Sequence, residues 1–142
     1  MQPDRGKKWP AGFPVEQVRV ARPTDQLDEV VRFYRDGLGL VELLRFEGHA
    51  GYSGVMLGLP GNRYHLEFTS HVNGSPCPAP TRDNLLVFYV PDRGAVTRTS
   101  DRLAAMGYSP VTAENPYWDE HDAVTIEDPD GWRVVLMPTQ GI

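Results

Sequence analysis

Hydrophobic and polar residues alternate along several short stretches of this chain, and one stretch has two unlike faces. Residues 63–69 carry apolar side chains at even positions and polar side chains at odd positions. A strand places these two sets on opposite faces. If the strand has only a structural role, such a polar row faces water. If the strand is part of a binding site, the polar row lines a cavity. The polar row consists of Arg63, His65, Glu67 and Thr69.

The first half of the chain reads as one strand, one helix and three further strands. Alternation and glycine or Pro-Gly punctuation predict strands over residues 17–21, 41–46, 52–59 and 64–70. After the first strand, apolar residues recur at three- and four-residue intervals and predict a helix that ends at Gly37. These helical positions are Leu27, Val30, Val31 and Tyr34.

The second half repeats this order after a polar, proline-rich linker at residues 71–82. It predicts a helix over residues 93–106, and strands at residues 85–90, 109–112, 123–127 and 132–137. Neither half can bury its sheet alone, so the repeat indicates one domain of two pseudo-symmetric modules. The predicted class is α+β, with a flexible arm at residues 1–14 and two βαβββ modules at residues 15–70 and 83–142.

The parity of four strands predicts which side chains form the core. Eleven even positions in these strands are apolar and are expected to pack against the helices, which leaves the odd positions to line a cup. In the first module the odd positions include Arg19, His65 and Glu67, so that half of the cup is polar. The eleven apolar even positions are Val18, Val20, Tyr64, Leu66, Phe68, Leu86, Phe88, Val90, Trp132, Val134 and Leu136.

The amino-acid composition indicates which partners and which cellular location to expect. The 142 residues include 14 Lys and Arg against 19 Asp and Glu, a net charge of -5, which argues against a nucleic acid partner. Cys77 is the single cysteine, so no intrachain disulfide forms and a reducing cytoplasm is the expected location. No apolar run is long enough for a signal peptide or a membrane span.

Two motifs, one in each half of the repeat, resemble those of a known superfamily. The motif FYRDGLGL at residues 33–40 and the motif DPDG at residues 128–131, before the last strand, are similar to those of the vicinal oxygen chelate superfamily. It includes glyoxalases, extradiol dioxygenases, and bleomycin and fosfomycin resistance proteins. The resemblance implies two βαβββ modules whose curved sheets form a cup, commonly completed or reinforced by dimerisation, so we expect a homodimer.

Metal-dependent members of that superfamily take His, Glu or Gln ligands from the first and last strands of each module. The resemblance places Arg19 at the first ligand position and Glu67 at the second. The third falls on Leu85, or on Asn84 after a slip in register, and the fourth falls on Val135. One ligand of four cannot hold a divalent ion beside a guanidinium, so we expect no catalytic metal and no cofactor.

The polar row itself offers candidate chemistry. We expect Arg19 to pair with Glu67 or to hold an anionic ligand in place of the ion, the alternative being two solvated surface charges. His65 is a candidate base or hydrogen-bond anchor, or simply a hydrogen-bonded wall residue, and Glu67 is a second candidate base. A residual metal site built on His65 and Glu67 stays open.

Further candidates lie in the second module. Tyr117, Trp118 and His121 precede the penultimate strand, where they either border the cup or pack against its rim. Tyr89 is placed in the wall by its odd position. The DPDG motif at residues 128–131 is interpreted as turn chemistry only.

Three functions follow, in order of preference. The first is a metal-free protein that binds a small molecule in a cup lined by Arg19, His65 and Glu67. The second is a glyoxalase-type lyase or isomerase with Glu67 or His65 as its base, in which Arg19 supplies the electrostatic stabilisation. The third is a non-catalytic scaffold whose cup is filled by its own side chains.

Overall fold

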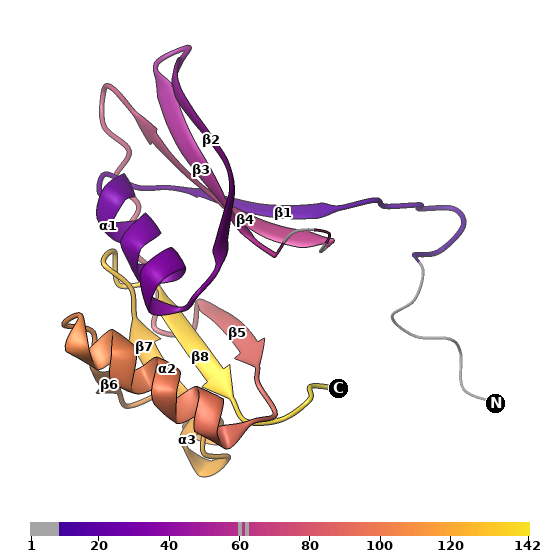
Figure 1. The fold of residues 1–142 in the computed structure, drawn as a ribbon, viewed down its shortest axis with the longest axis vertical. Helices are drawn as coiled ribbons and strands as arrows, with labels where there is room; N and C mark the ends of the chain where they lie inside the picture. The colour runs from indigo at the N-terminus through magenta and orange to yellow at the C-terminus, as the bar shows by residue number, and fades with distance from the viewer. Residues whose placement is uncertain (1–8, 60, 62) are drawn as a thin grey trace.

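The first module begins with the predicted strand and helix. We describe residues 9–59, 61 and 63–142 of a computed structural model. The helix α1 passes directly into the π-helical segment η1, and three strands follow it (Figure 1). The elements are β1 (Val18–Pro23), α1 (Leu27–Val31), η1 (Arg32–Gly37), β2 (Val41–His49), β3 (Tyr52–Gly58) and β4 (Tyr64–His71).

The second module has the same order, with one additional short helix. Asn115 begins this helix by accepting a hydrogen bond from the backbone N–H of Tyr117 at 3.0 Å. The sequence interpretation placed a loop at this position. The elements are β5 (Leu85–Tyr89), α2 (Arg93–Ala105), β6 (Pro110–Val111), α3 (Pro116–Glu120), β7 (Val124–Glu127) and β8 (Arg133–Met137).

Each module forms its own four-stranded mixed sheet. The strand orders are β1-β4-β3-β2 and β5-β8-β7-β6, and only the first and last strands of each module pair in parallel. This confirms the predicted α+β fold of two βαβββ modules. The two sheets are not joined, so within the described part of the chain β1 and β5 each keep one free edge and the cup is not closed.

The main core lies where the helices of both modules meet the two sheets. Phe33 of η1, Leu103 of α2 and Ile126 of β7 are fully buried in one continuous cluster. The helices touch closely because Gly37 has no side chain: a Cβ there would lie 2.3 Å from Cδ2 of Leu103. The Nε of Arg102 also donates to the carbonyl of Gly37 at 2.8 Å.

The predicted core face is correct for some strand positions and wrong for others. Phe68, Val134 and Leu136 are buried as predicted, whereas Val20 and Tyr64 are 59% and 58% exposed. The helix formed by α1 and η1 is short, and β1 and β4 extend beyond it, so their outer ends lack a covering element (Figure 1). Parity assigns a residue to a face, but burial also requires something to cover that face.

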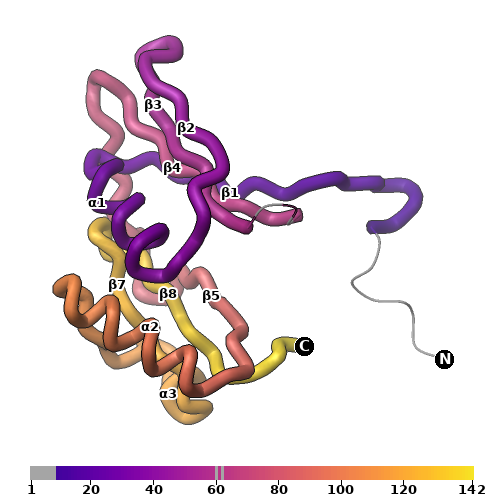
Figure 2. Tube along the Cα trace, viewed as in Figure 1, coloured from indigo at the N-terminus to yellow at the C-terminus, as the bar shows by residue number. Residues whose placement is uncertain are grey.

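The described part of the N-terminal segment, from residue 9 to the start of β1, leads away from both modules (Figure 2). The predicted arm, residues 1–14, lies partly outside the described residues. In the described part, the rings of Trp9 and Phe13 meet edge to face with centroids 6.2 Å apart, and the segment leads outward from β1 (Figure 2). Among the helices of the described residues, none has the length and apolar character needed to cross a membrane.

Candidate functional site

Parallel pairing of β1 with β4 brings the predicted polar row together. The register sets Arg19 opposite His65 and Ala21 opposite Glu67, so all four residues share one face of the sheet. The Nε of Arg19 donates to Nε2 of His65 at 2.8 Å, and its Nη1 lies 3.5 Å from Oε2 of Glu67. The three polar side chains therefore form one connected group centred on the guanidinium.

The contact with Arg19 determines what His65 can do. A guanidinium N–H only donates, so Nε2 of His65 accepts, and the neutral ring carries its proton on Nδ1. That Nδ1 is buried and has no hydrogen-bond partner among the described residues. His65 thus has no accessible lone pair for abstracting a proton, and its position fits a residue that orients Arg19.

Glu67 and Arg19 differ in their exposure. The side chain of Glu67 is 12% exposed, while that of Arg19 is 46% exposed and reaches the surface of the row. A separation of 3.5 Å is an ion pair of modest strength, so both groups retain capacity for an added ligand. This face can offer a carboxylate acceptor and a guanidinium donor side by side.

The predicted site residues of the second module lie elsewhere in the chain. Tyr117 of α3 stacks on the ring of His121, with centroids 4.2 Å apart, and is 46% exposed. Tyr89 is 46% exposed, and a Cβ at Gly141 would lie 3.4 Å from its ring. In Figure 1, α3 lies at the bottom of the view, below β5, whereas β1 and β4 lie above β5. One chain therefore does not assemble all seven candidates into one site.

The cup-facing side of the second sheet is covered by its own helix. Trp118 packs against a small apolar cluster on the odd positions of β5 and β8, where Val135 is fully buried and Met137 is 4% exposed. Leu85 belongs to the same cluster. The two metal-ligand positions expected in this module are therefore apolar and packed, and they do not fit a divalent ion.

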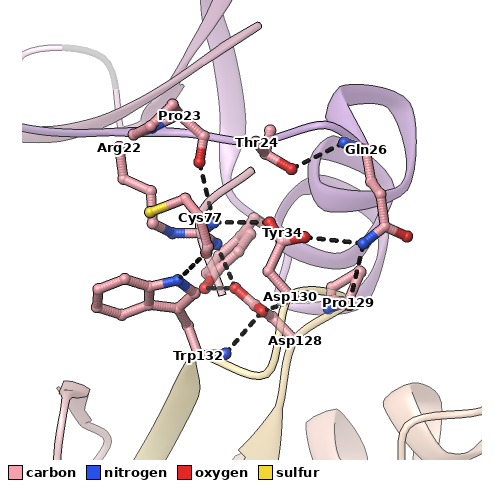
Figure 3. Close-up of polar contacts among 10 residues, drawn as sticks. All are labelled: Arg22, Pro23, Thr24, Gln26, Tyr34, Cys77, Asp128, Pro129, Asp130 and Trp132. Atoms are coloured by element: carbon pink, nitrogen blue, oxygen red, sulfur yellow. Dashed lines mark hydrogen bonds and ion pairs between the residues drawn. The ribbon is translucent and has the colours of Figure 1, made fainter. Parts of the chain in front are cut away.

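The structure also contains a buried charged cluster that links the two modules (Figure 3). Arg22 of β1 donates to Asp128 at 2.5 Å and to Asp130 at 2.7 Å. The hydroxyl of Tyr34 donates to the same Asp128 oxygen at 2.7 Å. The guanidinium carbon of Arg22 lies 5.0 Å and 5.1 Å from the ring centroids of Phe68 and Trp132.

Burial and charge shift the titration of this cluster. Burial and the adjacent Asp128 carboxylate raise the pKa of Tyr34 well above its ordinary value. Burial alone would lower the pKa of Arg22, but Asp128 and Asp130 outweigh it and raise that pKa. Burial raises the pKa of Asp128, against the opposing effect of Arg22 and Tyr34. The surrounding donors all require an acceptor, so the ionised carboxylate is the form that fits.

This cluster corrects the interpretation of the DPDG motif. Asp128 does accept hydrogen bonds within the turn, from the backbone N–H groups of Asp130 and Trp132 at 2.8 and 3.0 Å. Its other oxygen, however, binds Arg22 and Tyr34 across the module boundary. The sequence signal was present, because a lone arginine at an even, core-facing position of β1 needs a buried anion.

The comparisons with known proteins agree with this architecture. A model of the YycE-like N-terminal domain matches residues 18–69, and one of the YycE-like C-terminal domain matches residues 83–138. The uncharacterized protein YycE of Bacillus subtilis (strain 168) is 52% identical over 137 residues, covering 96% of this chain and 97% of YycE.

Solved structures extend the likeness. A crystal structure of Bacillus subtilis YycE, of unknown function and provisionally grouped with glyoxalases and fosfomycin resistance proteins, has 51% identity and a TM-score of 0.89, covering 96% and 98% of the two chains. The trypanothione-dependent glyoxalase I of Leishmania major has 18% identity and a TM-score of 0.66, covering 85% and 84%. TnmS3, an antibiotic-binding protein of a Streptomyces species, has 20% identity and a TM-score of 0.59, covering 85% and 93%. The chain belongs to the YycE-like family and has the vicinal oxygen chelate fold predicted from its motifs.

Proposed function

We propose that this protein binds a small molecule without a metal ion, at a cup whose first wall is the row of Arg19, His65 and Glu67. The observation that carries the proposal is the connected geometry of these three residues. A cation and a carboxylate held on one sheet face, 3.5 Å apart, present a donor and an acceptor to a polar ligand. His65 holds the guanidinium in place through the 2.8 Å hydrogen bond to its Nε.

The donor set favours a site without metal. In the described part of the chain, no group of three or more His, Cys, Asp or Glu side chains is arranged to hold an ion. Glu67 lies beside a guanidinium that repels cations, and Leu85 and Val135 belong to an apolar cluster. Oxygen- and nitrogen-ligated divalent ions require several converging donors, and these positions do not supply them.

We further propose that the working unit is a homodimer, in which the second copy supplies the other wall of the cup. Tyr89, Tyr117, Trp118 and His121 lie apart from Arg19 within one chain, so a wall that contains both groups requires two chains. The free edges of β1 and β5 and the exposed side chain of Tyr64 offer surface for this contact. Sedimentation of the purified chain tests this directly.

An enzyme of lyase or isomerase type is the second candidate, and one observation makes it specific. Nε2 of His65 already accepts from Arg19, which leaves the carboxylate of Glu67 as the available base. Its test is deuterium uptake from solvent at a carbon next to a carbonyl of an added substrate, in wild type and in Glu67→Gln. Uptake that depends on Glu67 would favour the enzyme over the binding protein.

A ligand screen by thermal shift, followed by calorimetric titration of each hit, tests the binding function. Arg19→Met and Glu67→Gln each remove one polar partner of the ligand. Each is expected to lower the affinity for a ligand found in the screen by about tenfold or more. Arg82→Met is the matched control, because Arg82 is 71% exposed and lies 3.9 Å from Glu114. Hits that bind all of these variants with equal affinity would refute the proposed site.

A further inference from the structure

A pocket lies at the seam between the two modules, beside the free edges of β1 and β5. Its volume is about 230 Å³. We call it the seam pocket. Tyr34 and Phe68 in its wall are 2% and 4% exposed, so the pocket reaches the buried core. Its wall is mostly apolar and aromatic and includes Val20, Tyr34, Leu66, Phe68, Leu86 and Trp132.

The seam pocket differs from the cup in both position and chemistry. Val20 and Leu66 occupy even positions of β1 and β4, so their side chains leave the sheet on the face opposite Arg19 and His65. Ala21, Glu67, Leu85 and Arg133, at odd positions, also contribute to the wall at the strand edges, whereas Arg19 and His65 do not. A ligand in the seam pocket would therefore contact neither Arg19 nor His65.

The charged side chains in the wall are already paired: Arg133 lies 3.3 Å from Glu127, and Glu67 lies 3.5 Å from Arg19. Arg22 lines the pocket, but its guanidinium binds Asp128 and Asp130 at 2.5 and 2.7 Å and lies over the rings of Phe68 and Trp132. An anionic ligand would lose its hydration there without gaining an unpaired cation, because Arg22 and Arg133 are both paired with carboxylates. The rings instead favour a flat, uncharged molecule that stacks against aromatic surface.

One polar group in the wall specifies the ligand further. The amide oxygen of Asn84 accepts from the hydroxyl of Thr81 at 2.6 Å. Among the described residues the NH₂ group of Asn84 makes no hydrogen bond, so it is available as a donor toward the pocket that Asn84 lines. A ligand that carries an acceptor oxygen would satisfy it.

We propose that the seam pocket binds an uncharged aromatic molecule of one or two rings that carries one hydrogen-bond-accepting oxygen. A cavity of about 150 Å³ already holds benzene, so the observed volume has room for a substituted ring. Glu67 is the one residue that this site shares with the row of Arg19, His65 and Glu67 proposed for the cup. Its competing occupant is a side chain of a second copy seated along the same strand edges.

Acetophenone, an uncharged ring with one carbonyl, is the probe, and binding is followed by chemical-shift changes of backbone amides. Val20→Trp should obstruct the pocket and weaken binding by about tenfold or more. Val20 is 59% exposed, so this change does not threaten folding. Val72→Trp is the matched control, because Val72 is an apolar residue that is 80% exposed and outside the pocket wall.

Two further comparisons make the inference specific. Asn84→Ala should lower the affinity for acetophenone by about fivefold, because one hydrogen bond is lost. Benzoate should bind to the wild-type protein at least about tenfold more weakly than acetophenone does. Arg19→Met should leave the affinity for acetophenone unchanged, even if it abolishes binding in the cup, because this probe carries no charge for the unpaired Glu67 carboxylate to repel.

Three results would overturn the inference. One is no shift of the amides near Leu66 and Trp132 at the solubility limit of the probe. The second is binding that is lost in Arg19→Met but kept in Val20→Trp, which would place the probe in the cup. The third is a dimer that excludes the probe and dissociates in Val20→Trp, because the pocket would then hold the second copy.

Discussion

Replacement of Arg22 by methionine is the most direct test of how the two modules are held together. Methionine keeps a long apolar side chain against Phe68 and Trp132 but removes the charge and all donors. Asp128 and Asp130, whose side chains are 0% and 8% exposed, would then remain buried without a cation. An unpaired buried carboxylate is costly because the protein replaces neither its hydration nor its counter-charge.

The expected cost follows from this burial. Breaking a buried ion pair by removing one partner destabilises a protein by about 3–5 kcal/mol. The side chain of Arg22 is itself only 12% exposed, so solvent screens little of the loss. For a domain of this length, the melting temperature should fall by on the order of 10 °C or more.

Urea unfolding followed by far-UV circular dichroism measures the change, with Arg35→Met as the matched control. Arg35 also contacts two carboxylates, Asp36 at 3.0 Å and Glu42 at 3.2 Å, but it is 41% exposed and should cost about 0–1 kcal/mol. The double variant Arg22→Met and Asp128→Asn should lose less free energy of unfolding than the sum of the losses in the two single variants. Equal losses of unfolding free energy in Arg22→Met and Arg35→Met would refute the claim that burial makes the Arg22 ion pairs important for stability.

Three other changes test separate features of the structure. Gly37→Ala should cost about 1–3 kcal/mol, since its Cβ would lie 2.3 Å from Leu103, whereas Gly12→Ala, with no atom within 4 Å, should be neutral in the same urea assay. Folded Tyr34 keeps its proton where the unfolded chain loses it, so stability should be full below pH 10.0 and fall above it by up to about 1.4 kcal/mol per pH unit. Tyr34→Phe should show a shallower fall, and an unchanged slope would contradict the raised pKa. Addition of Ni²⁺, Zn²⁺, Mn²⁺ or Fe²⁺ to chelator-treated protein should leave the melting temperature unchanged, and a rise that grows with ion concentration would overturn the metal-free site.

The order of the elements and the repeat were determined by the sequence alone. Alternation and helical spacing depend on neighbours a few residues apart, so the strands and helices emerged within a few residues of their observed ends. The same parity placed Arg19 and Glu67 on one face, and the structure brings their charged ends within 3.5 Å. The helix that carries Trp118 was missed because five residues provide too little periodicity.

Contacts between distant parts of the chain were decided only by the tertiary structure. The ion pair of Arg22 and Asp128 joins residues 106 positions apart, and no local pattern gives their distance. The burial of Val135 beneath Trp118 and the exposure of Val20 also depend on which element covers each face. Local periodicity determines the face of the sheet on which a side chain lies. The packing of the two modules determines whether another element covers that face.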